Sequence, residues 1–197
     1  MGSIASVVTL LFFYLFTMAY SAFAYIGVSL GGFRMARKVD MPRPWLFWIP
    51  VANAYAMGHL ADTQAIRCEG KSTTLRKKMV IWSVVLTVAA IIWAVSLGVI
   101  GFVAATAADT ASLTGLLSVG LITSLMFFVP YIIYLVIYYK SLYRIYKLYA
   151  PNDAGGFLVL SIFINVSLPI LFLVLSGKEP DLPTPEDTAE AAPDYIL

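Results

Sequence analysis

Three cations in the second half of the sequence recur at a spacing that places them on one face of a helix. Lys140, Arg144 and Lys147 stand at positions i, i+4 and i+7, which is the repeat of a helical stripe. A neighbouring stripe at the same spacing consists of Tyr139, Tyr143 and Tyr146. Clustered positive charge binds phosphates without sequence specificity, and aromatic rings beside it can stack on bases. The chemistry that these residues indicate is the binding of anions.

Further basic residues cluster nearer the N-terminus, and together with the stripe they form a candidate docking surface. Its members outside the stripe are Arg34, Arg37, Lys38, Arg43, Lys71, Arg76, Lys77 and Lys78. Such cations commonly serve as topology determinants that contact anionic membrane lipids. The sharper alternative is a surface that docks a partner, either an acidic protein segment or RNA. Both readings stay open on the sequence.

The sequence contains no pattern typical of an enzyme. It has no nucleophile with a base at motif spacing, no phosphate-binding loop and no dinucleotide fingerprint. The potential metal ligands His59, Asp62, Cys68 and Glu69 do not have the spacing of a strong site. A single cysteine also excludes an internal disulfide. We therefore expect no catalytic residue, no metal and no cofactor.

The composition indicates that a bilayer surrounds most of the chain. Apolar residues make up 60% of the sequence and charged residues 12%, whereas a soluble domain has about 25% charged residues. A spanning helix needs about 20 apolar residues, and four segments meet this length. They are residues 4–33, 79–108, 113–139 (continuing as a helix to 150) and 157–175. The first segment lacks a basic start and runs far past the length of a signal peptide, so we expect it to be retained.

Segment 44–61 is also apolar, but the charges on both sides of it argue against a crossing. If it spanned, the basic loop 62–78 would lie outside, contrary to the cytoplasmic bias of Lys and Arg in short loops. Pro50 would break a helix that passed through the segment, and its length from there to Ala61 is short of the ~30 Å core. We therefore predict a re-entrant or interfacial element. The residues that shape it are Trp45, Trp48, Pro50, Asn53 and His59.

The predicted fold is an all-α integral membrane protein with four transmembrane helices and one Pro-broken re-entrant segment. Residues 1–176 form a single membrane domain, and residues 177–197 form an acidic disordered tail. With four crossings both termini lie outside, and twelve of the thirteen Lys and Arg residues lie in the cytoplasm. Only Lys178 is then external.

Small residues in the apolar segments predict close helix packing, because small side chains let backbones approach where lipid supplies no hydrophobic drive. The positions are Gly27, Gly31, Ala90, Ala94 and Gly98. Packing within one chain is the simpler interpretation, and a homodimer face is the alternative. Asn165 lies within the fourth predicted span, where a buried amide needs a partner, and we expect it to bond between helices.

The stretch W-L-F-W-I-P-V-A-N-A-Y-A-M-G-H-L-A-D resembles a group of small multi-pass membrane proteins of anaerobic Gram-positive bacteria. The matching positions are Trp45, Trp48, Ile49, Pro50, Asn53, Tyr55, Gly58 and Asp62. The later Y-R-I-Y-K-L-Y-A-P-N-D, followed by L-x-L-S-I, is similar to the same group, and the likeness covers most of residues 20–176. It implies a location in the bacterial cytoplasmic membrane and specifies no activity.

The sequence thus predicts a non-enzymatic membrane binding or accessory protein whose basic cytoplasmic face docks a partner. The alternative is a small-solute transporter or channel subunit in which segment 44–61 lines a path, as interrupted helices do in carriers. Its polar contacts would be Asn53, His59 and Asn165.

Overall fold

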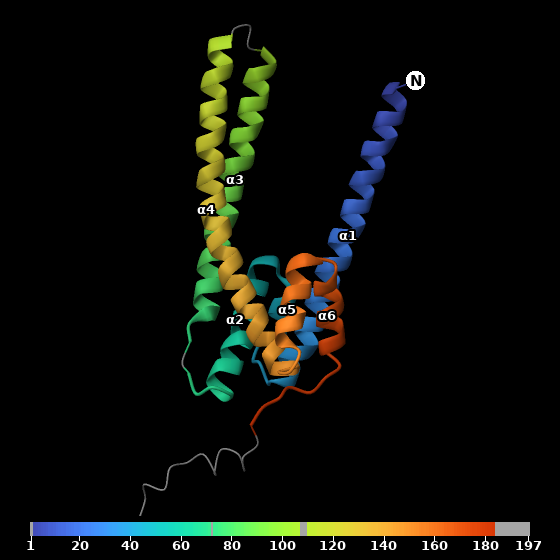
Figure 1. The fold of residues 1–197 in the computed structure, drawn as a ribbon, viewed down its shortest axis with the longest axis vertical. Coiled ribbons are helices and arrows are strands. Elements are labelled where there is room, and N and C mark those ends of the chain that lie inside the picture. Colours follow the sequence, from blue (N-terminus) through green and yellow to red (C-terminus); the bar gives the residue numbers. More distant parts are fainter. Residues whose placement is uncertain (1, 72, 107–109, 184–197) are drawn as a thin grey trace, which may run out of the picture.

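The computed structural model describes residues 2–71, 73–106 and 110–183, and in these ranges the chain is all-helical (Figure 1). Six α-helices and one short 3-10 helix follow one another. Their bounds are α1 Gly2–Lys38, η1 Pro44–Trp48, α2 Pro50–Arg67, α3 Leu75–Thr106, α4 Thr110–Tyr149, α5 Ala154–Phe163 and α6 Ser167–Leu175. The predicted all-α class is confirmed.

In the described part of the chain, α1, α3 and α4 are the three helices that are long and apolar enough to cross a membrane. α3 and α4 form a long antiparallel hairpin (Figure 1). Trp93 of α3 stacks on Phe127 of α4 with ring centroids 4.8 Å apart. The indole N–H of Trp93 also donates to the Ser124 hydroxyl over 3.3 Å. These three helices correspond to the first three predicted spans.

The fourth predicted span, residues 157–175, is not one helix. α5 has 10 residues and α6 has 9, so each is about 15 Å long, half of the ~30 Å hydrocarbon core. Pro169 explains the break, because it has no N–H for the carbonyl of Asn165 and its ring would clash with that carbonyl. In α6 it occupies the first turn, where no backbone donor is needed. The prediction of four spans is therefore wrong.

α5 and α6 form a hairpin that begins and ends at the same end of the bundle. α6 returns along α1, where Gly27 faces Pro169 and Gly31 faces the backbone of Phe172 so closely that an added Cβ would lie 2.7 Å and 2.6 Å away. The chain then passes the end of α1, and the Lys38 ammonium lies 3.0 Å from the Glu179 carboxylate. The first residues of the acidic tail therefore pack against the C-terminal end of α1.

The location of both termini outside the membrane stays a prediction, because the described structure shows three candidate spans and not the sides on which their ends lie. The structure does place Lys178 relative to the other cations. Lys178 lies beside Lys38, whose ammonium donates to its carbonyl over 2.7 Å. The thirteen Lys and Arg residues belong to the last turns of α1, α2 and α4, the first turn of α3 and the loops beside them. These segments lie toward one end of the bundle (Figure 1), which we call the basic end. The rest of the predicted tail, residues 184–197, lies outside the described residues.

Between α1 and α3 the chain turns back along α1 before α2 begins. The Tyr25 hydroxyl donates to the Trp48 carbonyl, and Tyr25 precedes Lys38 by about 20 Å of helix. Phe47 of η1 is fully buried and rests on Gly32 of α1, where an added Cβ would meet its ring at 2.3 Å. α2 then runs to Arg67, six residues beyond the predicted end, and it is not among the three candidate spans.

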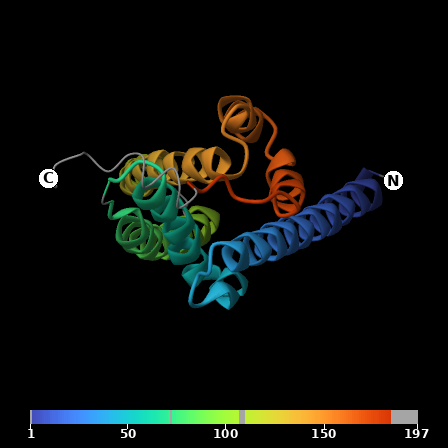
Figure 2. The same cartoon turned by 90° about the horizontal axis from the view of Figure 1, so that it is seen from below.

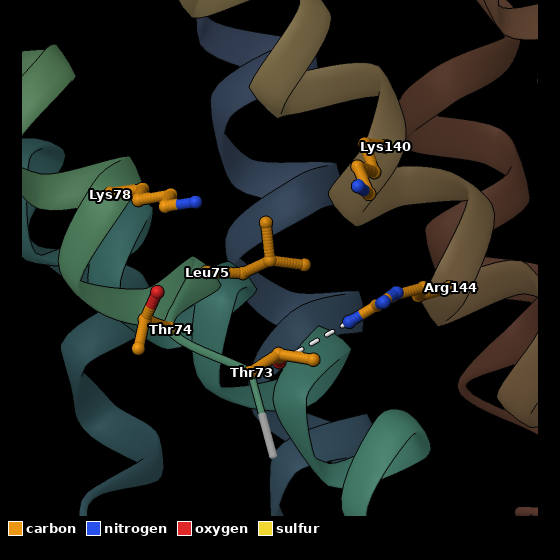
Figure 3. A pocket seen from close by; sticks show the side chains of 6 residues that line it. All are labelled: Thr73, Thr74, Leu75, Lys78, Lys140 and Arg144. Atoms are coloured by element: carbon orange, nitrogen blue, oxygen red, sulfur yellow. Dashed lines mark hydrogen bonds between the residues drawn. The ribbon is translucent and has the colours of Figure 1, made fainter. Parts of the chain in front are cut away.

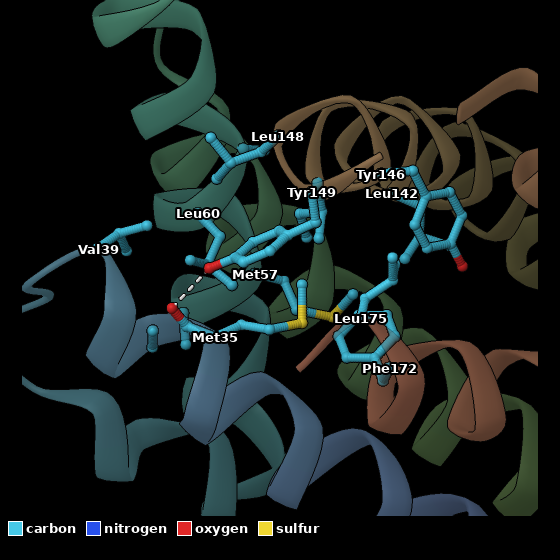
Figure 4. Packing of buried hydrophobic residues seen from close by; sticks show 14 of the residues in the cluster. Met35, Val39, Met57, Leu60, Leu142, Tyr146, Leu148, Tyr149, Phe172 and Leu175 are labelled. Atoms are coloured by element: carbon cyan, nitrogen blue, oxygen red, sulfur yellow. Dashed lines mark hydrogen bonds between the residues drawn. The ribbon is translucent and has the colours of Figure 1, made fainter. Parts of the chain in front are cut away.

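The hydrophobic core lies at the basic end, where the ends of all the helices meet (Figure 4). Tyr149 is nearly fully buried and donates its hydroxyl to the Met35 carbonyl over 2.7 Å, joining α4 to α1. Tyr146 is fully buried and its hydroxyl lies 2.7 Å from that of Ser161, joining α4 to α5. The short elements η1, α2, α5 and α6 thus fill the space that three long helices alone would leave at this end.

Among the described residues, the opposite halves of the long helices contribute no member of this core. The large apolar side chains of α1 between Val7 and Phe16 are 57–69% exposed, and this half of α1 stands apart from the α3–α4 hairpin in both views (Figures 1 and 2). On α3, Ala90 is half-buried, whereas Ala94 and Gly98 are exposed. Close packing within the chain is therefore not seen at Ala94 and Gly98, and a homodimer through the small residues of α3 stays a prediction.

Candidate anion-binding site

Two helices and the loop before one of them enclose a basic pocket of about 240 Å³ (Figure 3). Lys78 comes from α3, and Lys140 and Arg144 come from α4. Thr73, Thr74 and Leu75 complete the lining. The three cationic side chains approach one space from opposite sides, and two threonines supply hydroxyl groups beside them. We call this space the basic pocket.

The position of the pocket along the helices is set by where their apolar stretches stop. No charged residue occurs in α3 after Lys78, and none occurs in α4 before Lys140. Lys78 and Lys140 are thus the first charged groups that the α3–α4 hairpin presents at the basic end. If the apolar lengths lie in lipid, these two ammonium groups stand at the boundary between hydrocarbon and headgroups.

Asp62 of α2 holds the loop that forms one wall of the basic pocket. Its side chain is buried, 3% exposed, and its carboxylate accepts from the backbone N–H groups of Leu75 at 3.1 Å and Arg76 at 3.2 Å. The Thr73 hydroxyl donates to the same carboxylate. Asp62 thereby caps the N-terminus of α3 from a different helix, and it satisfies donors that would otherwise have no partner.

Arg144 is tied to this wall, since its guanidinium donates to the Thr73 hydroxyl over 3.2 Å. The side-chain salt bridges among the described residues involve the cations Lys38, Lys71 and Lys147. They do not include Lys78, Lys140 or Arg144. The basic pocket therefore carries positive charge that no described carboxylate neutralises by an ion pair, and it can accept an anion.

Lys147 separates from the other two members of the predicted stripe. Its ammonium lies 2.8 Å from the carboxylate of Glu69 in the α2–α3 loop. Gln64 also donates to this carboxylate, over 3.2 Å. The hydrogen bond from Lys147, followed by that from Gln64, lowers the pKa of Glu69 from 4.5 to about 2. Lys147 holds the loop in place and is not a member of the basic pocket.

We expect the Lys147→Gln variant to raise the pKa of Glu69 toward 4.5, because the hydrogen bond is the main cause of the lowered value. A lowered carboxyl pKa stabilises the fold above pH 4.5, and this contribution is lost as the pH falls toward 2. A ¹³C carboxyl NMR titration of glutamate-labelled protein in micelles, assigned with Glu69→Gln, measures the shift. Lys71→Gln is the control, since Lys71 is 4.0 Å from Glu69 and should have a smaller effect. An unchanged pKa in Lys147→Gln would contradict the pairing.

The remaining predicted docking residues are spread around the basic end and do not converge on the basic pocket. Arg34, Arg37 and Lys38 line a second pocket beside Ser176, where Glu179 neutralises Lys38. Arg43 borders an apolar pocket beside α2. The exposed residues Lys71, Arg76 and Lys77 point to no described pocket. The pockets therefore do not unite these residues in one site, and a continuous docking surface stays a prediction.

The polar residues of the transporter alternative are also separated. Asn165 is exposed in the turn between α5 and α6, so the prediction of a buried interhelical amide is wrong; the break at Pro169 has moved it out of any span. The His59 ring lies 6.1 Å from that of Tyr55 on the same helix, and burial, followed by the charge of Arg76, lowers its pKa. Asn53 lines a pocket between α1, α2, α3 and α4.

The other predicted re-entrant residues take local roles. Trp45 and Trp48 are 52% and 42% exposed, and their position at a membrane interface stays a prediction. Pro50 is in the first turn of α2. Sequence reasoning missed Thr73, Thr74 and Asp62 as parts of the site. The pair of threonines directly before a helix was a recognisable N-terminal signal, whereas the capping of α3 by Asp62 depends on a contact between helices.

Comparisons of the chain with protein-family models, with curated proteins and with solved structures find no match. Across the described ranges, no group of three or more His, Cys, Asp or Glu side chains could hold a metal ion. The fold and the site therefore define the class on their own. The chain is an all-helical protein whose three long apolar helices suggest a multi-pass membrane protein, with a basic pocket where the apolar lengths of two of them end.

Proposed function

We propose that this is a multi-pass membrane protein that binds the phosphate headgroup of an anionic lipid in the basic pocket. One observation carries the proposal: Lys78 and Lys140, the first charges at the ends of two apolar helices, line one pocket with Arg144 and without a paired carboxylate among the described residues. Basic pockets between transmembrane helices are suited to lipid headgroups. The Thr74 hydroxyl can donate a further hydrogen bond to a phosphate oxygen, whereas the Thr73 hydroxyl already donates to Asp62.

The geometry favours a lipid over RNA or an acidic protein. Base stacking needs free aromatic faces, but Tyr146 is fully buried in the core and only Tyr143 of the predicted tyrosine stripe is exposed. Lys147, the third cation of the stripe, is occupied by Glu69. What remains is a compact pocket at a helix boundary, which fits one headgroup better than an extended polymer.

The distribution of charge supports a cytoplasmic position for the basic end. All thirteen Lys and Arg residues lie toward that end, and Lys and Arg in short loops favour the cytoplasmic side. The proposal therefore places the N-terminus of α1 outside and the basic pocket at the inner leaflet, where anionic lipids attract cations.

Neutralising two pocket lysines together should weaken lipid binding strongly. At ~1 kcal/mol for each cation near a charged headgroup, Lys78→Gln with Lys140→Gln should raise the Kd for phosphatidylglycerol by about 30-fold. Titration of the lipid into delipidated protein, followed by native mass spectrometry, measures this change. Arg144 is left intact in the variant because it also supports Thr73.

The matched control is Lys71→Gln with Lys77→Gln, which removes the same charge from exposed residues of the basic end that line no described pocket. We expect this double variant to change the Kd by less than about threefold, because salt screens the attraction between distant exposed charges and the lipid. Equal weakening in both double variants would show that the pocket has no special role. Equal binding of phosphatidylcholine and phosphatidylglycerol by the unaltered protein would also overturn the proposal.

A further inference from the structure

A second group of cations lies at the C-terminal end of α1, apart from the basic pocket. Arg34, Arg37 and Lys38 stand at positions i, i+3 and i+4, so they share one face of the helix. Together with Ser176 at the end of α6 they line a pocket of about 360 Å³. We call this space the α1 pocket. It shares no lining residue with the basic pocket.

The positive charge of the α1 pocket is only partly neutralised. The Lys38 ammonium lies 3.0 Å from the Glu179 carboxylate. The salt bridges among the described residues do not include Arg34 or Arg37, and the Arg37 guanidinium lies over the Phe33 ring, 5.8 Å from its centroid. Three cations thus share one carboxylate, and arginine has the fork of donors that suits a phosphate.

Glu179 is a carboxylate that another anion can replace. Its side chain is 82% exposed, so water and dissolved anions reach its ion pair with Lys38. Exposed ion pairs contribute little to stability, because solvent screens them. A phosphate group in the α1 pocket would be attracted by three cations, whereas Glu179 pairs with one of them. The phosphate therefore has the advantage in competing for the Lys38 ammonium.

Glu179 belongs to a segment that crosses the basic end, residues 177–183, which we call the C-terminal strap. The strap leaves α6, passes the end of α1 and runs toward α4 and α2 (Figures 1 and 2). The Lys38 ammonium donates to the Lys178 carbonyl over 2.7 Å and also pairs with Glu179. One lysine of the α1 pocket thus makes both polar contacts that hold the first half of the strap to α1.

The second half of the strap contacts α4 and the end of α2. The Asp181 N–H donates to the Leu148 carbonyl of α4 over 2.7 Å, and Leu182 packs against the hydrophobic core. The thiol of Cys68, directly after α2, donates to the Asp181 carbonyl over 3.4 Å. A strap that loses its contacts with Lys38 keeps only these contacts near its end, so it will leave Cys68 more often.

We propose that the α1 pocket is a second phosphate-binding site, in which the ligand displaces Glu179 from Lys38 and releases the C-terminal strap from α1. This site is separate from headgroup binding at the basic pocket. It adds a conformational response, since one ligand oxygen takes the place of a carboxylate that ties down the chain. A free phosphate and a lipid headgroup share the required chemistry, and the experiment distinguishes them.

The reaction of Cys68 with N-ethylmaleimide measures release of the strap, because Cys68 is the single cysteine of the chain and the reagent is uncharged. Burial, followed by the charge of Asp181, raises the pKa of the Cys68 thiol. The thiolate is the reacting form, so release should lower this pKa and speed the reaction at a fixed pH. The expected increase is up to about fivefold, the factor that corresponds to one exposed ion pair.

Two additions to the full-length protein in micelles identify the source of the phosphate. Inorganic phosphate is added at constant ionic strength, with sodium chloride as its reference. Phosphatidylglycerol is added in mixed micelles, with phosphatidylcholine as its reference. An increase with either addition supports the site and names its ligand, whereas no increase with both would overturn the proposal.

Glu179→Gln should raise the rate without any addition, because the amide has no charge to pair with Lys38, and phosphate should then have little further effect. Asp153→Asn is the matched control, since it neutralises an exposed carboxylate that belongs to none of the described salt bridges. It should change neither the rate nor the response. A Glu179→Gln rate equal to that of the unaltered protein would contradict the role of this carboxylate.

Arg34→Gln with Arg37→Gln should abolish the response to phosphate, because Lys38 and Glu179 then remain as a balanced pair. Lys78→Gln with Lys140→Gln removes the same charge from the basic pocket and should keep the response, even if no headgroup binds there. The two proposals can therefore fail separately. Equal loss of the response in both double variants, each checked for its fold by thermal unfolding, would show that only the overall charge acts and would overturn the α1 site.

Discussion

Replacing Asp62 with alanine should lower the free energy of unfolding by about 3 kcal/mol, because three donors lose their acceptor at a buried site. The Leu75 and Arg76 N–H groups begin α3, and Thr73 positions the loop before it. Without the carboxylate these groups are unsatisfied in a place that water reaches poorly. Arg144 also loses a fixed hydrogen-bond partner, because Asp62 no longer holds the Thr73 hydroxyl to which its guanidinium donates. We expect the packing at the basic end to weaken, while the opposite halves of α1, α3 and α4 stay helical.

Reversible unfolding in SDS-containing mixed micelles, followed by tryptophan fluorescence, gives the free energy for this test. Asp153→Ala is the control, because Asp153 precedes α5 but is exposed and makes no side-chain capping hydrogen bond. Its loss should change the free energy of unfolding by less than about 0.5 kcal/mol. If the two variants had the same stability, Asp62 could not be the cap of α3.

The second large effect is expected at Gly58, where α2 crosses the start of α3. An added Cβ at this position would lie 2.5 Å from the Cα and 2.8 Å from the N of Arg76. These are backbone atoms, so no side-chain rotation relieves the overlap. Gly58→Ala should therefore force the helices apart and lower the free energy of unfolding by about 2 kcal/mol, even though alanine favours a helix by about 1 kcal/mol.

Gly98→Ala provides the opposite case on a neighbouring helix. Apart from the backbone of its own helix turn, no described atom lies within 4 Å of an added Cβ at Gly98. Only the helix propensity therefore acts, and the variant should gain up to about 1 kcal/mol. The same unfolding measurement compares the two glycines directly. A gain in stability in both variants would show that α2 and α3 do not approach as closely as the structure has them.

Much of the architecture could be predicted from the sequence because the length of an apolar segment indicates whether that segment can cross a membrane. A segment that crosses must be apolar for about 20 residues, and this property is visible without knowing any contact. Residues 4–33, 79–108 and 113–139 therefore lie within α1, α3 and α4, apart from 107–108, which the structure does not describe. The rule failed at residues 157–175. This segment is long and apolar enough to span, but its hydropathy does not show that Pro169 lacks the backbone N–H that a continuous helix needs.

The helical stripe of Lys140, Arg144 and Lys147 shows where the predictability of the site ends. Periodicity correctly placed these residues on one helix, but it cannot say what each one meets. Glu69 removes Lys147 from the set and Lys78 joins it, through contacts between residues more than sixty positions apart. In the same way, the exposure of Asn165 and the burial of Asn53 in a pocket follow from how the short elements pack.

The sequence by itself determined the helical class of this protein and the three long apolar segments that suggest a membrane protein, since both depend only on the order of residues along the chain. The tertiary structure decided which cations share a pocket, which carboxylate caps α3, and that residues 157–175 turn back. The physical reason is the distance along the chain over which each effect acts. The apolar character of a segment depends on that segment alone, whereas a pocket forms only when packing brings distant segments together.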